Sequence, residues 1–274
     1  MKAEKRTWYR LALARGSEPA TLVAAEGDHL GAAIALAEKH VDGAHVIACD
    51  VAHDGVPLGE SVGKQHIVEL GASSDLESLR WPAGVLPQIG HTAELAQAAK
   101  GWIRRPDSKA FVVEAQTTHE NLVDLFLGLI ERLPSADNLE VKVLDHFPAA
   151  NPDAPKKTDV WLTARANAKK ILAFLDDYDR DLIDNGHVEL GVYVRAQNAT
   201  LRLTEHKTVV WVAETDALAN DLAEWLRALD VPQVTQMTRL ASVPHFHYRG
   251  SKTRDRKKLG DELFKQRLRK VATT

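Results

Sequence analysis

The strongest constraint on the fold is the spacing of apolar side chains between residues 158 and 240. This spacing switches repeatedly between the two-residue period of a strand and the 3.6-residue period of a helix. Several short segments alternate apolar and polar side chains, or are apolar throughout, as strands do: residues 159–163, 187–195, 200–204, 208–213 and 234–240. Two longer segments, residues 167–183 and 215–229, place apolar side chains on one helical face. The order strand, helix, three strands, helix, strand predicts an α+β sandwich with a mostly antiparallel sheet.

One short sequence pattern recurs in both halves of the chain. Residues 41–46 (Val-Asp-Gly-Ala-His-Val) and residues 183–188 (Ile-Asp-Asn-Gly-His-Val) each end a predicted helix and begin a predicted strand. The arrangement resembles ferredoxin-like α/β sandwich modules in outline, and this likeness of architecture implies no activity. Two interpretations stay open: an internal duplication, or a helix-stop signal that recurs by chance.

Proline and glycine mark the expected segment boundaries. Residues 148–157 contain three prolines and form the best candidate linker, and residues 71–90 are a second stretch rich in these residues. We therefore expect an N-terminal α/β domain over residues 1–147 and a C-terminal α/β domain over residues 158–248. Residues 249–274 would follow as a basic helical arm.

The composition favours a folded cytoplasmic protein. Hydrophobic residues make up 45% of the chain and charged residues 27%, which excludes disorder for most of it. Cys49 is the single cysteine, so an internal disulfide and a Cys-rich zinc site are excluded. The first 16 residues lack the apolar centre of a secretory signal, and the apolar run at residues 122–130 is too short to span a bilayer.

Charge is divided unevenly along the chain. Residues 249–274 hold ten cationic and three acidic side chains, a net charge of +7. The remaining 248 residues therefore carry −10, because the whole chain carries −3. An acidic body with a basic C-terminal segment is the most unusual feature of the sequence.

Residues 253–271 contain no proline and many strong helix formers, so they predict one amphipathic helix. Four cations fall within an arc of about 60° at helical spacing. These are Arg254, Lys258, Lys265 and Arg269, while the apolar residues Leu263 and Leu268 lie on the other half of the helix. We expect the four cations to contact phosphate or carboxylate groups of an anionic partner, and the two leucines to seat the helix.

The partner of this helix is left open by the sequence. An acidic protein surface and nucleic acid are both compatible with a line of cations, and an anionic membrane surface would be bound weakly. The cations could equally be solvated, or could dock on the protein's own acidic run, which contains Asp176, Asp177, Asp181 and Asp184. A non-enzymatic binding or regulatory protein is our first functional hypothesis.

His245 and His247 are candidate metal ligands. On a strand both side chains project from one side, with Phe246 and Tyr248 on the other. A metal site needs at least a third ligand, and candidates are Glu114, His119, Asp145 and His146. The alternative is a pair of edge-strand histidines whose neighbouring aromatic residues are buried.

The remaining motifs give little support for an enzyme. His45, Cys49, Asp50 and His53 cluster within nine residues, where Cys49 is a candidate nucleophile or a small core residue. The sequence contains no phosphate-binding loop, no dinucleotide-binding glycine motif and no H-E-x-x-H pair, so we expect no cofactor. A metal-dependent enzyme using the His-x-His pair is the second hypothesis. The third is a structural or assembly protein, a homo-oligomer formed through exposed sheet edges.

Overall fold

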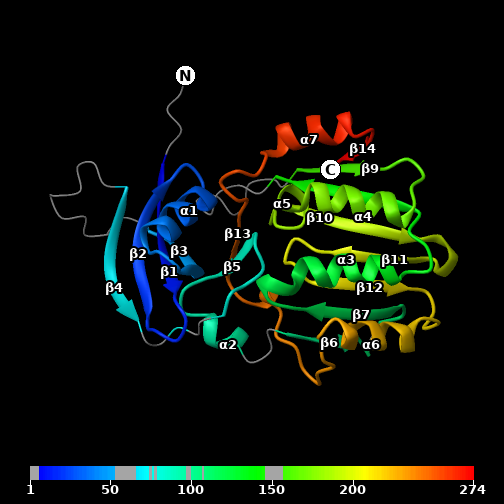
Figure 1. Ribbon diagram of the computed structural model, residues 1–274, viewed down its shortest axis with the longest axis horizontal. Coiled ribbons are helices and arrows are strands. Elements are labelled where there is room, and N and C mark those ends of the chain that lie inside the picture. The colour runs from blue at the N-terminus through cyan, green and yellow to red at the C-terminus, as the bar shows by residue number, and fades with distance from the viewer. Residues whose placement is uncertain are drawn as a thin grey trace.

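The computed structural model describes residues 6–52, 66–73, 76, 79–96, 100–106, 108–145 and 157–274. Over these residues the chain forms two large β-sheets with a two-stranded sheet between them (Figure 1). The strand pairs of all three sheets are antiparallel. The expectation of a mixed α+β protein with mostly antiparallel sheets is therefore confirmed.

The smaller of the two large sheets has the strand order β3-β1-β2-β4. Its strands are β1 (Thr7–Ala14), β2 (Ala20–Gly27), β3 (His45–Val51) and β4 (Ile67–Ser73). Helix α1 (Leu30–His40) covers one face and buries Ala33 and Ala37 completely. Small apolar residues suit this contact because they let the helix approach the strands closely.

The larger sheet has eight strands in the order β14-β9-β8-β10-β11-β12-β7-β6. They are β6 (Gly101–Arg104), β7 (Phe111–Gln116), β8 (Asn138–Leu144), β9 (Thr158–Leu162), β10 (Val188–Val194), β11 (Ala199–Leu203), β12 (Val209–Ala213) and β14 (Arg269–Thr273). One face is covered by α3 (Leu122–Arg132), α4 (Ala168–Asp177) and α6 (Ala219–Ala228) (Figure 1). The short helices α2 (Thr92–Ala96) and α5 (Asp179–Leu182) lie in the connections.

The alternation that predicted the strands corresponds to the buried face of this sheet. In β10, Val188, Leu190, Val192 and Val194 are buried in the main core, as the period of two requires. The opposite face carries charged side chains that pair across strands, such as Lys142 with Glu189 at 3.0 Å. One face is therefore a core and the other is polar.

The eight-stranded sheet extends across the expected linker at residues 148–157. Strand β8 precedes this segment and β9 follows it, and the two strands are neighbours in the sheet. The C-terminal segment 249–274 adds β14 to the edge of the same sheet. Strands from both expected α/β domains and from the basic segment therefore belong to one sheet, and their buried residues share one core.

The predicted strand at residues 234–240 is wrong. Residues 234–240 have no strand structure, and the one bridge beside them joins the preceding Gln233 to Trp102 of β6. The Trp102 amide donates to the Pro232 carbonyl, and the Val234 amide donates to the Trp102 carbonyl. The segment thus touches the sheet edge at one point and then leaves it.

The two copies of the helix-stop pattern differ in local geometry. Gly43 in the first copy adopts a positive φ of 71°, where glycine is favoured. Gly186 in the second copy instead lies against the backbone of Gly84. The two glycines serve different purposes, and the internal duplication stays a prediction.

The two-stranded sheet links the large sheets. It pairs β5 (Val85–Pro87) with β13 (His245–His247). Gln88, directly after β5, bridges to Cys49 of β3, so this small sheet is attached to the four-stranded one. Phe246 and Tyr248 pack against the core of that four-stranded sheet. Strand β13 therefore lies on the boundary between the two halves of the molecule.

The expected single helix over residues 253–271 is replaced by a helix and a strand. Helix α7 (Arg256–Lys265) begins after Asp255, whose carboxylate accepts from the Lys258 amide at 2.9 Å. The helix ends before Arg267, which has a φ of 63°, and the chain reverses into β14. Arg269 consequently lies on the edge strand and not on the helical stripe.

Candidate functional site

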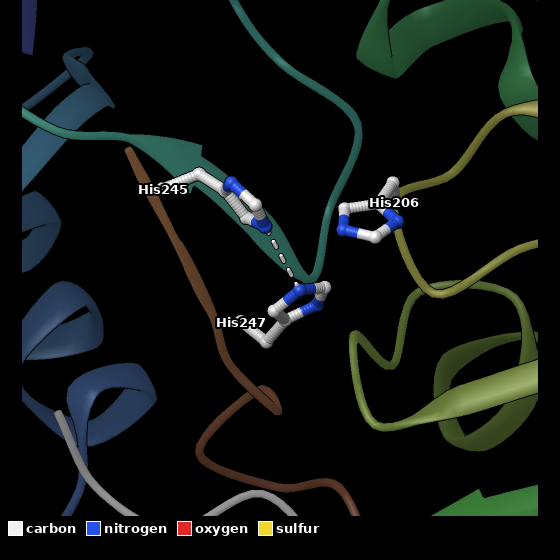
Figure 2. A group of neighbouring side chains, drawn as sticks. All are labelled: His206, His245 and His247. Atoms are coloured by element: carbon white, nitrogen blue, oxygen red, sulfur yellow. Dashed lines mark hydrogen bonds between the residues drawn. The ribbon is translucent and has the colours of Figure 1, made fainter. Parts of the chain in front are cut away.

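Three histidines from two distant segments meet at the boundary between the halves. His245 and His247 project from one side of β13, as the strand period predicts. The third is His206, in the turn that joins β11 to β12. Figure 2 shows the three rings facing one another across the space between this turn and β13.

The rings form a nearly equilateral triangle. Their centroids are 4.8 Å apart for His206 and His245, 4.9 Å for His206 and His247, and 5.0 Å for His245 and His247. One ligand atom from each residue lies within 4.8 Å of the other two. The Nε2 atoms of His245 and His247 are 3.2 Å apart.

In two of the three rings the other nitrogen is held by a backbone carbonyl, and the third ring makes a longer contact. His245 Nδ1 is 2.7 Å from the Val243 carbonyl oxygen, and His247 Nδ1 is 3.1 Å from the Gly186 carbonyl oxygen. His206 Nδ1 lies 3.7 Å from a carboxylate oxygen of Glu205. Because a carbonyl oxygen accepts and cannot donate, Nδ1 of His245 and of His247 must carry the hydrogen. In the neutral rings, Nε2 then presents a lone pair.

Two lone pairs that face each other at this distance repel, unless a proton shared by the two Nε2 atoms or a metal ion lies between them. A metal ion meets this requirement, because neutral imidazole nitrogen is a common ligand of transition metals. Zinc–nitrogen bonds of about 2.0–2.1 Å at a tetrahedral angle place two ligand nitrogens about 3.3 Å apart. The observed separation of 3.2 Å fits that geometry. Acceptors on the outer nitrogens are also usual at metal-binding histidines, where they fix the ring orientation.

A tight turn positions His206. The Thr204 amide donates to the Thr208 carbonyl at 3.0 Å, and the Lys207 amide donates to the Thr204 carbonyl at 3.0 Å. Lys207 adopts a φ of 62°, which is uncommon for a residue with a side chain. Its side chain is fully buried, and its Nζ donates to the Asn185 carbonyl at 2.7 Å. Burial lowers the pKa of this amine to about 7.

Backbone contacts position the two histidines of β13. The Gly186 amide donates to the Tyr248 carbonyl at 3.0 Å, and the Tyr248 amide donates to the Gly84 carbonyl at 2.8 Å. A Cβ atom at Gly186 would lie 1.9 Å from the Gly84 oxygen, so this approach requires glycine. The segment that carries Gly186 also receives hydrogen bonds from His247 and Lys207. It therefore anchors both sides of the histidine centre.

The expected additional ligands of the His-x-His pair have other partners. Glu114 is buried and accepts from Arg239 Nε at 2.7 Å, and Asp145 pairs with Arg256 at 3.0 Å. His119 lies near Arg80, and burial together with that charge lowers its pKa. His146 lies outside the described residues. None of the three that are described joins the group of His206, His245 and His247.

The cluster around Cys49 is not arranged for nucleophilic chemistry. Cys49 is completely buried, and burial raises the pKa of its thiol well above the usual value. Asp50 pairs with Arg10 at 3.2 Å on the solvent side. Burial lowers the pKa of His45, and His53 lies outside the described residues. The arrangement fits the interpretation of Cys49 as a small core residue.

The residues expected to bind a partner divide into two groups. Leu263 and Leu268 are buried in the main core. Arg254 pairs with Asp181 of the acidic run, whose carboxylate also accepts from the Arg254 amide at 2.7 Å. The neighbouring Arg256 pairs with Asp159 at 2.8 Å. Both arginines hold the C-terminal segment on the body, but only Arg254 pairs with the acidic run that the intramolecular alternative named, because Asp159 lies outside it.

Lysines of α7 face outward. Lys258 and Lys265 have side chains that are 75% and 70% exposed, and each makes a 3.6 Å contact with an acid three residues earlier on the same helix. Phe264 stands beside Lys265 and is 72% exposed. A groove of about 1350 Å³ runs along this helix and the ends of β8 and β9. Lysines 257, 258 and 265 and Phe264 contribute to its lining.

Comparison with known proteins found no matching family model, no similar curated protein and no similar solved structure. Among the described residues, no helix combines the length and apolar character needed to cross a bilayer.

Proposed function

We propose that this protein binds a transition-metal ion of the zinc class through His206, His245 and His247. The observation that carries the proposal is the facing pair of Nε2 atoms in His245 and His247, 3.2 Å apart, with both Nδ1 atoms directed to backbone carbonyls. A cation between the rings relieves the repulsion of their lone pairs. Figure 2 shows His206 turned toward the same point.

The metal would join the two halves of the protein. His206 belongs to a turn of the eight-stranded sheet, while His245 and His247 belong to β13, whose neighbouring residues pack on the four-stranded sheet. Metal binding would stabilise the native state, because the unfolded chain does not hold these ligands together. Three nitrogen ligands are also the set used by catalytic zinc. The metal-dependent enzyme therefore stays a prediction at this same site.

Metal titration tests the proposal. Isothermal titration of chelator-treated protein with Zn²⁺ should give one site per chain. We expect His206→Ala and His245→Ala each to lower the affinity by at least about 100-fold, because each removes one of three ligands. His40→Ala is the matched control, since His40 lies on the surface beside Glu69, away from the centre. Equal zinc affinity in all four proteins would refute the metal site.

We propose as a second function that the outward face of α7 docks an anionic partner. The supporting observation is the contrast between the cations of this helix and Arg254, which precedes it. Arg254 is committed to a carboxylate that is only 10% exposed, whereas Lys258 and Lys265 make weak pairs at the surface. Exposed pairs within one helix contribute a few tenths of a kcal/mol, so a partner's anions can replace them.

Retention on immobilised heparin, a polyanion, tests this second function. The double variant Lys258→Glu, Lys265→Glu should elute at markedly lower salt than the wild type. Lys169→Glu, Lys170→Glu makes the same charge change on exposed positions of α4 and serves as the control. If the two double variants elute together, the face of α7 is not the docking site.

A further inference from the structure

The solvent face of α7 combines an exposed aromatic ring with positive charge. At 100° per residue, positions 257, 258, 261, 264 and 265 fall on the half of the helix opposite Leu259 and Leu263, which are buried. Apart from Phe264, the residues on this half are three lysines and one aspartate. The ring therefore stands among charges and is not part of an apolar patch.

The groove beside this face carries a positive balance. Its lining includes seven cationic and four acidic side chains. Asp145 and Asp159 are paired with Arg256 and Lys270, so these four charges cancel within the protein. The excess of cations is found on the lysines that line the open side. A chain of phosphates running along the groove would meet several of them in succession.

We infer that this groove binds single-stranded nucleic acid, with one base stacked on Phe264 and the backbone phosphates along the lysines of α7. The inference rests on the proposed docking of an anionic partner and names its class. Proteins that bind single strands combine a cationic groove with aromatic side chains, because every base offers a flat face for stacking. A duplex would not serve equally well, since its bases are already stacked on one another.

A protein partner fits this face less well. Aromatic anchors in protein interfaces insert into dry pockets and are surrounded by contacts that exclude water. Here Phe264 projects into solvent between charged residues, so a partner surface large enough to bury it would also have to desolvate those charges. A single base covers one face of the ring and leaves the lysines in contact with water and phosphate.

Fluorescence anisotropy with labelled 12-nucleotide oligothymidine and oligouridine tests the inference on the full chain. If three lysines contact phosphates, raising the salt from 50 to 200 mM should weaken binding about 20-fold. Phe264→Ala should weaken binding about tenfold while leaving the salt dependence unchanged, because it removes stacking and no charge. Lys258→Glu, Lys265→Glu should weaken binding further and flatten the salt dependence. Lys169→Glu, Lys170→Glu should have no effect.

The outcomes separate this inference from the docking function on which it rests. Retention on heparin without affinity for either oligonucleotide would overturn the nucleic-acid inference and leave the anionic partner in place. Equal binding of polyglutamate and oligonucleotide, both insensitive to Phe264→Ala, would indicate an acidic protein surface instead. A 12-base-pair duplex that binds more tightly than the single strand would also overturn the inference. Because Phe264 and the lysines are exposed, the variants should keep the melting temperature of the wild type.

Discussion

The histidine centre and helix α7 both present nitrogen-bearing side chains, but they are held in place by different means. Two of the three histidines direct one nitrogen to a backbone carbonyl and turn the other to the centre. At α7 and the residues just before it, the side chains that fix the helix are different from those that face outward. Arg254 and Arg256 are tied to aspartates of the body, whereas Lys258 and Lys265 project into solvent.

This difference shows how the protein's own contacts decide which groups are left for a ligand. A histidine has two nitrogens, so one can be anchored while the other binds. An arginine that is fully engaged with a buried carboxylate is already used by the fold. The arrangement of the three histidines should therefore depend on the backbone carbonyls that accept from them. The attachment of α7 to the body should depend on the arginine–aspartate pairs. Two substitutions test these dependences.

The largest effect is expected at Gly186, beneath the histidine centre. In Gly186→Ala, the new Cβ would lie 1.9 Å from the Gly84 oxygen and 2.9 Å from the Tyr248 oxygen, and backbone atoms cannot move aside cheaply. We expect a loss of about 3 kcal/mol in the free energy of unfolding, measured by urea denaturation in the presence of chelator. Zinc affinity should fall as well, because the Gly186 carbonyl accepts from His247.

Gly191→Ala in β10 is the control for this change. A Cβ atom there meets its nearest neighbours at 3.6 Å, an ordinary contact, so stability should change by about 0.5 kcal/mol or less. If Gly186→Ala were as stable as Gly191→Ala and bound zinc normally, the backbone would not be what organises the centre.

Local sequence patterns predicted the elements that bury one face. The alternation in β10 and the apolar stripe of α4 both indicated the core correctly, because each pattern reflects contacts within one segment. The spacing of apolar residues could not show where a helix ends or which strand a segment pairs with. Residues 253–271 are rich in helix formers throughout, yet Arg267 takes a positive φ and the pairing of β14 with β9 replaces the last turn. Tertiary pairing overrode helix propensity there.

The same limit applies to the site. His245 and His247 were identifiable because two residues of a strand at this spacing share a side. His206 was not, since it lies about 40 residues earlier in a turn that the sequence marks only by Glu205, His206 and Lys207. In the structure, the fully buried side chain of Lys207 marks the turn that carries His206 as unusual. In the sequence, Lys207 resembles any other lysine in a turn.

A smaller effect on stability should distinguish the cation that is paired with the body, Arg254, from the outward-facing Lys258. Arg254→Ala removes the partner of the Asp181 carboxylate, which is only 10% exposed, so we expect a loss of about 2 kcal/mol in the free energy of unfolding. Lys258→Ala breaks an exposed pair within the helix and should change stability by about 0.5 kcal/mol or less. Urea denaturation of both variants at low salt measures the difference.

The ranking should reverse for heparin retention, because Lys258 faces outward and Arg254 is held against the body. If Arg254→Ala reduced retention as much as Lys258→Ala without loss of stability, the arginine would belong to the docking face, and the division between structural and outward cations would be wrong.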